Sequence, residues 1–287
     1  MAYRSGLIVA SCVFLFLSGC GGEPAGTDNA AAMEEEKAPL SIPAPDQELI
    51  AIAAGEHRAA DNVARNSWRH PVETLQFFGL EKGMVVAEIW PAGGWYTEVI
   101  APYLQGNGTY VAAHWDPESS VEFIRKGVAR YQEKLDAHPD LYSDVEMTVL
   151  MHPDNMDFMP DNSVDMIVTF RNVHNWMGRD YADEMLSTLY KVLKPGGILG
   201  VVEHRGDPAV PQDPKAASGY VNQDYMVELA EKAGFQLVGG SEINANPLDT
   251  KDYEAGVWSL PPTLRAGDEQ RYRDIGESDR FTLKFVK

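Results

Sequence analysis

Histidines follow several short apolar segments of this chain, at the places where buried strands would end. Such segments are typical of parallel sheets, in which ligands bind at the carboxyl ends of the strands. Four of the seven histidines stand at such positions: His114, His152, His174 and His204. A neutral imidazole can take a proton from a nucleophile near neutral pH, so these positions are candidates for acid–base chemistry.

Strand and helix patterns alternate along the sequence and would position these side chains. Apolar runs predict strands at 84–89, 110–114, 147–151, 166–170, 198–203, 235–243 and 281–286. Amphipathic spacing predicts helices at 95–104, 121–135, 181–193 and 221–233. The alternation predicts an α/β fold with a doubly wound, mostly parallel seven-stranded sheet and N-terminal capping helices.

The stretch Met84–Leu104 contains the first strand, turn and helix of this series, and Gly93 and Gly94 form the turn. In such a unit the backbone comes close to a ligand, and the helix N-terminus faces it. The same turn occurs in α/β proteins of many kinds, so the turn alone does not identify a ligand.

Two further segments border the predicted sheet. Trp68–Pro71 interrupts the N-terminal helices, because proline disfavours the helical conformation in the residue before it. We assign Arg69 and His70 in this segment to the surface or to helix caps. Residues 244–280 form a long connection that is a candidate lid, with Trp258 and the prolines after it as an apolar flap.

The charge balance excludes two kinds of partner. The chain has 43 acidic and 24 basic residues, which gives a formal net charge of −19. Nucleic-acid-binding proteins need a basic surface, and anionic lipid attracts clusters of lysine and arginine. We therefore expect no nucleic acid partner, and any membrane attachment must use something other than basic residues.

A candidate lipid attachment site stands near the N-terminus. The apolar run Leu7–Leu17 has signal-peptide length, and Leu17-Ser18-Gly19-Cys20 at its end resembles the lipobox of bacterial lipoproteins. The alternative is an ordinary secretory signal with a chance cysteine. We predict a lipoprotein signal peptide at 1–19, lipidation of Cys20, a flexible tether at 20–45 and a folded domain at 46–287. Gly21 is typical of outer-membrane sorting in that family, so we expect a lipid-anchored envelope protein that faces the periplasm.

Residues 60–287 resemble class I S-adenosylmethionine-dependent methyltransferases. The resemblance rests on the glycine turn and on two specific segments, Met159–Asp165 and Leu193–Gly197. Within that family the chain is most similar to an uncharacterised "predicted methyltransferase" subgroup, through Glu88–Gly94, Phe170–Trp176 and Gly276–Arg280. The resemblance implies a Rossmann-like methyltransferase fold, S-adenosylmethionine as cofactor and a small-molecule methyl acceptor.

The resemblance also implies a set of cofactor-binding residues: Glu88, Ala92, Gly93, Gly94, His114, Asp116 and Asp157. The chain departs from the family at two places. Trp90 and Ala92 stand where the family has glycines, and His114 stands where it usually has the acid that accepts the ribose hydroxyls. Asp116 is the nearest acid that a shift of register would bring to that position.

In the strand order of this family the fourth and fifth strands are neighbours, which brings His174 and His204 to one pocket. We expect either histidine to act as general base, with Arg171 or Arg205 holding a carboxylate or phosphate of the substrate. Arg171, His174 and His204 are therefore the predicted catalytic residues.

Three alternatives stay open. The polar side chains could merely satisfy loop backbone at a wet sheet edge, or three of the histidines with Glu203 could bind zinc, although we assign no metal ligand. The protein could also be a non-catalytic envelope binding protein that uses the nucleotide cleft. An envelope location would separate the enzyme from its cytoplasmic cofactor, and the sequence does not define the oligomeric state.

Overall fold

The computed structural model describes residues 44–287, which belong to one compact unit, Ile42–Lys287. The predicted signal peptide, Cys20 and nearly all of the predicted tether lie outside the described residues. Within the described part, no helix is both long and apolar enough to cross a membrane.

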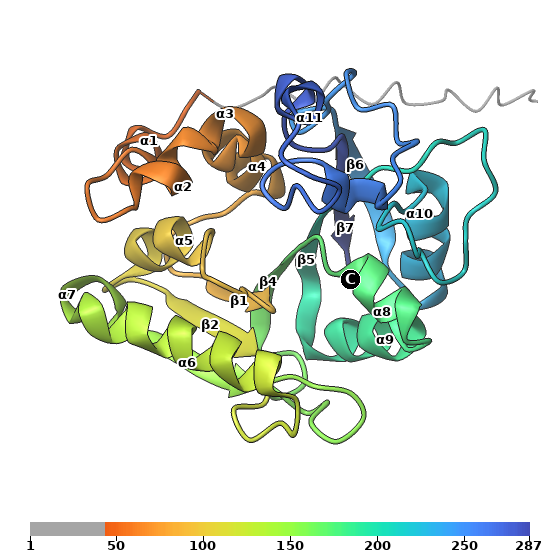
Figure 1. Cartoon of the computed structure of the whole chain (residues 1–287). Helices are drawn as coiled ribbons and strands as arrows, with labels where there is room; N and C mark the ends of the chain where they lie inside the picture. The colour runs from red at the N-terminus through yellow and green to blue at the C-terminus, as the bar shows by residue number, and fades with distance from the viewer. Residues whose placement is uncertain (1–43) are drawn as a thin grey trace, which may run out of the picture. The chain divides into compact units, whose positions relative to one another are not determined.

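A seven-stranded sheet runs through this unit in the order β3-β2-β1-β4-β5-β7-β6 (Figure 1). The strands are β1 (Val85–Ile89), β2 (Thr109–His114), β3 (Val145–Val149), β4 (Val164–Phe170), β5 (Leu193–His204), β6 (Gln236–Ser241) and β7 (Arg280–Val286). The first five strands pair in parallel, and β7 runs antiparallel between β5 and β6. The predicted doubly wound, mostly parallel sheet is confirmed.

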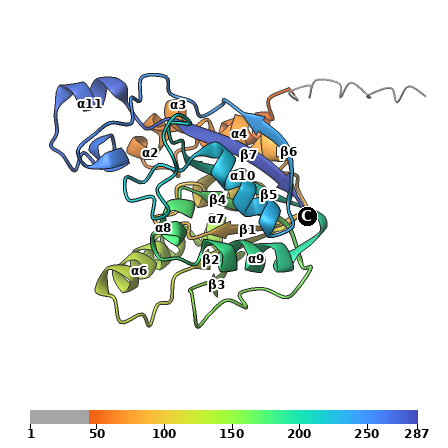
Figure 2. The same ribbon diagram turned by 90° about the vertical axis from the view of Figure 1, so that its right-hand side faces the viewer.

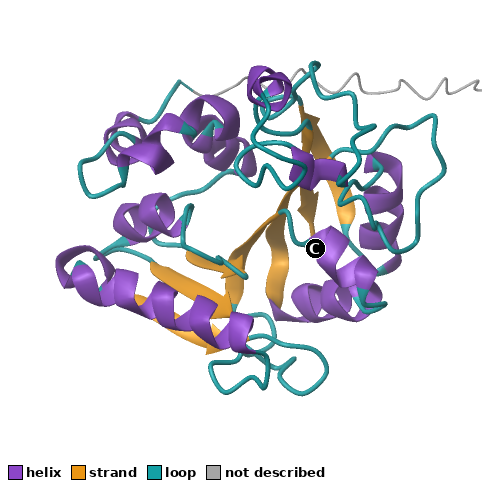
Figure 3. Cartoon of the chain, viewed as in Figure 1, coloured by secondary structure: helices purple, strands orange, loops and turns teal. Residues whose placement is uncertain are grey.

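Helices cover both faces of the sheet, as Figure 3 shows by secondary structure. One face carries α1 (Gln47–Ala53), α4 (Pro71–Phe78), α5 (Thr97–Leu104), α6 (Glu122–Ala137) and α7 (Pro139–Tyr142). The short helices α2 (Ala60–Ala64) and α3 (Asn66–Arg69) lie between α1 and α4 in the chain. The other face carries α8 (Val173–Gly178), α9 (Ala182–Val192) and α10 (Gln223–Lys232). Alternate strand residues pack into the two layers: Val86 joins the first core and Ala87 the second, and both are fully buried. This two-sided burial explains the continuous apolar runs in the sequence.

The candidate lid contains a 3₁₀ turn, η1 (Gly256–Ser259), and α11 (Gln270–Ile275). Figure 2 shows α11 near α2 and α3, beyond the end of the sheet. Residues from the two ends of the described chain therefore meet above the carboxyl ends of the strands.

Three predicted boundaries are wrong, each for a local reason. The third strand lies at Val145–Val149 rather than at 147–151, because this edge strand is only partly buried and its apolar signal is weak. The fifth strand begins at Leu193 rather than at 198, because β5 includes Leu193–Gly197 and tolerates an irregular register there. The segment after β4, for which no helix was predicted, contains α8, a helix too short to show periodicity.

Candidate active site

A cavity of about 420 Å³ opens at the carboxyl ends of the central strands. Its walls come from the first loop (Ala92), the end of β2 (Trp115), the segment after β4 (Arg171–His174), the end of β5 (His204) and the lid (Trp258, Pro261, Pro262, Glu277, Ser278). A hollow of about 470 Å³ at Gly106–Thr109 and Ser143–Glu146 lies at the opposite ends of the strands and is more open. The ligand edge of an open α/β sheet is the carboxyl edge, so the first cavity is the candidate site.

His174 stands in the first turn of α8, where Glu203 at the end of β5 fixes its orientation. The imidazole Nδ1 lies 3.1 Å from Glu203 Oε1, and the backbone N–H of His174 donates to Glu203 Oε2 at 3.3 Å. Glu203 is fully buried. Because a carboxylate only accepts hydrogen bonds, we assign a proton of His174 to Nδ1, and Nε2 has no hydrogen-bond partner among residues 44–287.

His204 lies beside His174, and their ring centroids are 5.5 Å apart. Its Nδ1 is 2.6 Å from the hydroxyl oxygen of Ser278, a lid residue. Burial lowers the pKa of His204 well below its ordinary value, and the neighbouring His174 and Arg171 lower it further. His204 is therefore neutral at physiological pH, as a proton acceptor must be. The two predicted catalytic histidines meet in one cavity as expected, and Arg171 joins them there.

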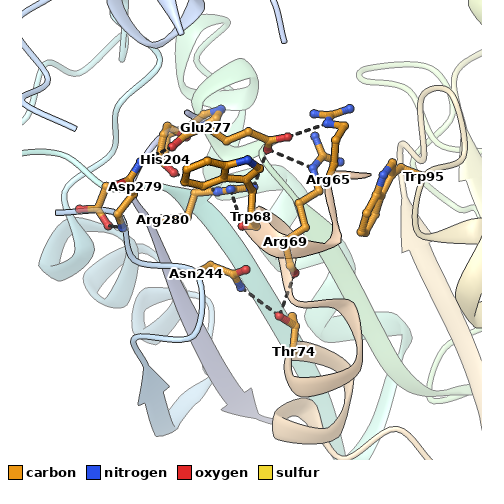
Figure 4. Close-up of polar contacts among 12 residues, drawn as sticks. Arg65, Trp68, Arg69, Thr74, Trp95, His204, Asn244, Glu277, Asp279 and Arg280 are labelled. Carbon is orange, nitrogen blue, oxygen red and sulfur yellow. Dashed lines mark hydrogen bonds and ion pairs between the residues drawn. The ribbon is translucent and has the colours of Figure 1, made fainter. Parts of the chain in front are cut away.

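A cluster of arginines surrounds Glu277 at one wall of the cavity, with Arg69 and Arg280 buried and Arg65 partly exposed (Figure 4). Glu277 pairs with Arg65 at 2.5 Å, with Arg69 at 3.1 Å and with Arg280 at 3.1 Å. Burial raises the pKa of Glu277, but the positive charges of Arg69, Arg280 and Arg65 outweigh it and hold the pKa at about 2. The assignment of Arg69 to the surface is wrong, because its side chain is 2% exposed and pairs with Glu277.

The first loop has positive φ angles at Trp90 and Ala92, two places where the family has glycines. Trp90, Ala92 and Gly94 all have positive φ angles, of 49°, 53° and 73°. A residue with a Cβ atom in this conformation carries a cost of roughly 1–2 kcal/mol. The indole of Trp90 offsets part of it by packing in the core and donating to the Leu150 carbonyl at 2.8 Å. Trp90 and Ala92 therefore adopt a backbone conformation that favours glycine.

His114 and Glu88, two predicted cofactor ligands, are occupied within the protein. His114 is fully buried, with Nε2 at 3.1 Å from the Ala92 carbonyl and Nδ1 accepting from the Trp115 backbone N–H. Burial lowers its pKa to about 4. Glu88 accepts from the Tyr110 hydroxyl at 2.5 Å, and burial raises its pKa to about 7 against that hydrogen bond. Neither residue lines the cavity; both brace the loop that does.

The other predicted cofactor residues lie at different depths. Ala92 lines the cavity, and a Cβ on Gly93 would meet open space. A Cβ on Gly94 would instead lie 2.9 Å from Tyr131 of α6, so this glycine permits helix packing and not ligand approach. Asp116 is half-buried and accepts from the Glu118 backbone N–H, whereas Asp157 pairs with Lys191 on the surface, away from the cavity.

Other expected positions also differ from the structure. His152 stacks on Tyr181, with ring centroids 4.5 Å apart, and does not line the cavity. Arg205 does not line the cavity either, and pairs with Glu242 and Asp279. Sequence reasoning missed Trp115, whose ring lines the cavity. It also missed Phe123, which is 68% exposed at the cavity rim. An exposed aromatic on a helix beside a strand end was the available signal.

One group of side chains could hold a metal ion. His174, Glu203 and His204 each offer a ligand atom, and these atoms lie within 4.8 Å of one another. This set has two histidines and a carboxylate rather than three histidines. The neighbouring arginines place positive charge beside it, which disfavours a divalent cation.

Comparison with known proteins gives one match to a family model. Residues 95–201 match the model of a methyltransferase domain, so this part of the chain is similar to such a domain. The match begins directly after the first loop, the place where the sequence departs from the family's glycine pattern. Among curated proteins, none matches the chain by sequence.

Solved methyltransferase structures share the fold of this domain. A S-adenosylmethionine-dependent methyltransferase from Aquifex aeolicus is 18% identical with a TM-score of 0.53, covering 78% of this chain and 93% of its own. An arsenic(III) S-adenosylmethionine methyltransferase from Chlamydomonas reinhardtii is 15% identical with a TM-score of 0.50, and the alignment covers 84% of this chain and 73% of that protein. The [4+2]-cyclase SpnF is 16% identical with a TM-score of 0.56, and the alignment covers 86% of this chain and 98% of the cyclase. Because a cyclase shares the fold, the fold alone does not fix the reaction.

The match to the methyltransferase domain model supports S-adenosylmethionine as the cofactor and methyl transfer as the activity. The residues present fit that cofactor at the first loop, where Ala92 reaches the cavity and the space over Gly93 is open. The ring of Trp115 and the backbone after β4 complete this side of the cavity. The family's ribose acid has no counterpart among the cavity residues, so these groups would carry the binding.

Proposed function

We propose that this protein transfers a methyl group from S-adenosylmethionine to a small-molecule acceptor, with His174 as general base. The observation that carries the proposal is the Glu203–His174 pair, which leaves His174 Nε2 without a hydrogen-bond partner among residues 44–287 while the ring lines the cavity. The methyltransferase domain match supports the reaction type.

Each residue of the site has one task in this proposal. S-adenosylmethionine, when bound, supplies an electrophilic methyl group. His174 Nε2 takes the proton of the acceptor's nucleophile, and Glu203 holds the ring and stabilises the charge that forms on it. Neutral His204 borders the same space, and the lid residues Trp258 and Pro261 keep water from it.

Calorimetric titration of the purified full chain with S-adenosylmethionine and S-adenosylhomocysteine tests the cofactor. Release of S-adenosylhomocysteine in the presence of small hydroxyl, thiol and amine acceptors then tests turnover. His174→Ala should lower turnover by roughly 10²- to 10⁴-fold and leave cofactor affinity nearly unchanged, because the imidazole faces the acceptor. His152→Ala, which alters a histidine outside the cavity lining, should keep wild-type turnover.

Each alternative predicts a different result. A zinc enzyme would lose a bound metal in the His174→Ala protein, and metal analysis would detect the loss. A non-catalytic binding protein would release no S-adenosylhomocysteine with any acceptor. The absence of heat with both adenosyl compounds would reject the proposed cofactor.

We also propose that the mature protein is anchored to the cell envelope by lipid on Cys20, facing the periplasm. Leu17-Ser18-Gly19-Cys20 and the apolar run before it support this proposal. Cys20→Ala should abolish partitioning of the protein into detergent. Cys12→Ala, within the predicted signal peptide, should leave partitioning intact. Unchanged partitioning of Cys20→Ala would reject the anchor.

A further inference from the structure

Arg171 is a cation without a counter-ion of its own. Its guanidinium lines the cavity and makes no hydrogen bond or ion pair within residues 44–287. Its backbone N–H donates to the Val202 carbonyl at 2.7 Å, and its φ angle of 61° is unfavourable for a side chain with a Cβ. The fold thus holds Arg171 in a strained conformation at the end of β4, with its charge toward the cavity.

The surroundings of Arg171 have too little negative charge to neutralise it. Glu277 is already shared by Arg65, Arg69 and Arg280. Burial, followed by the charge of Arg171, lowers the pKa of Arg69 to about 9, as expected where buried guanidiniums are under-compensated. With Glu203 counted as a second carboxylate, four arginines face two acids at this wall. An oxyanion that enters the cavity would relieve this imbalance.

Aromatic and proline side chains also line the cavity, together with polar groups such as Asn175 and Thr263. Trp258 lies over His174, with ring centroids 5.9 Å apart, and Pro261 and Pro262 continue this surface. Trp115 and Phe123 also line the cavity, with ring centroids 6.2 Å apart. The cavity therefore offers a ligand both the Arg171 cation and apolar surface.

We propose that the methyl acceptor is a small oxyanion with an apolar body, its carboxylate or phosphate on Arg171 and its body between Trp258 and Trp115. This inference rests on the proposed function, because it names the acceptor of the same site. The planar guanidinium matches the two oxygens of either group, and the aromatic rings match a flat or aliphatic body.

Benzoate and phenyl phosphate are suitable probes, with benzyl alcohol as the uncharged counterpart and inorganic phosphate as the anion without a body. Calorimetry on the purified full chain should show binding of benzoate or phenyl phosphate and at least tenfold weaker binding of benzyl alcohol. Arg171→Gln should weaken binding of the anion by about 10- to 100-fold, and Arg171→Lys should restore part of it. Arg205→Gln is the matched control, because Arg205 pairs with Glu242 outside the cavity lining and should leave the affinity unchanged.

Trp258→Ala tests the apolar half of the site. It should weaken binding of benzoate or phenyl phosphate several-fold and leave binding of inorganic phosphate unchanged. Equal losses for both ions would show a general disturbance of the lid and reject the apolar contact.

Titration of benzoate into protein saturated with S-adenosylhomocysteine separates the acceptor from the cofactor. Retained affinity is expected, whereas competition would assign Arg171 to the cofactor's own carboxylate and overturn the inference. Loss of anion binding after treatment with a chelator would transfer the anion to a bound metal and also overturn it. If anions bind through Arg171 but no adenosyl compound binds, the oxyanion subsite stands and the proposed function fails.

Discussion

Glu88 shows how the environment of one residue sets a pH dependence of stability. Folding raises its pKa from 4.5 to about 7, first by burial, so between these pH values the folded state holds a proton that the unfolded state has released. The free energy of unfolding therefore falls as the pH rises through this window, and the loss is complete above the folded pKa.

Glu88→Gln should remove this dependence. When the pH is raised from 4.5 to 8, the free energy of unfolding of the wild type should fall by roughly 2–3 kcal/mol more than that of the variant. Urea unfolding at both pH values measures the difference. Glu146 lies on the exposed face of edge strand β3, so the free energy of unfolding of Glu146→Gln should depend on pH as that of the wild type does. A Glu88→Gln protein with the wild-type pH profile would contradict the prediction.

The segment before β7 joins the N-terminal helices to the sheet. Glu277 receives Arg65 and Arg69 from the region of α3, and the left-handed Gly276 packs so closely on Trp68 that an added Cβ would lie 2.2 Å from its ring. Buried pairs of this kind leave uncompensated charge when one partner is removed. The position of α3 therefore depends on a carboxylate far along the chain.

Glu277→Gln should lower the free energy of unfolding by about 3–5 kcal/mol, because the buried Arg69 and Arg280 and the partly exposed Arg65 lose their shared carboxylate. Hydrogen exchange should accelerate in α2, α3 and α4 more than in β1 and β4. Glu242→Gln is the control, since Glu242 pairs with Arg205 but is 67% exposed, and it should cost less than about 1 kcal/mol. Comparable losses of unfolding free energy in the two variants would show that burial of the Glu277 cluster does not contribute to stability.

Ligand binding should stabilise the molecule as a whole. S-adenosylhomocysteine at 100 times its Kd adds about 2.7 kcal/mol to the free energy of unfolding, since it binds the folded state. For a domain of this size the midpoint of thermal unfolding should rise by roughly 5–10 °C. Adenosine and homocysteine supplied separately should raise it less. An unchanged melting temperature at saturating ligand would argue against a cofactor site.

The sequence by itself determined the order of the elements and the edge of the sheet where the site lies. The buried strands and the longer amphipathic helices show in the periodicity of short segments, so no long-range contact is needed to recognise them, whereas a short helix such as α8 does not show there. The ends of neighbouring parallel strands necessarily lie close together, which is why His174 and His204 could be placed in one pocket. The family resemblance then led to the same reaction type as the domain match.

Only the tertiary structure decided what each polar side chain faces. Arg69 is buried because Glu277, 208 residues later in the chain, folds over it. The residue type of His114 suggested a ligand contact, and packing against Ala92 gave it an internal partner instead. Gly94 faces Tyr131, so the variant Gly94→Val would strain helix packing and is a poor probe of ligand binding. These outcomes depend on contacts between segments that are far apart in the sequence, and local periodicity does not predict such contacts.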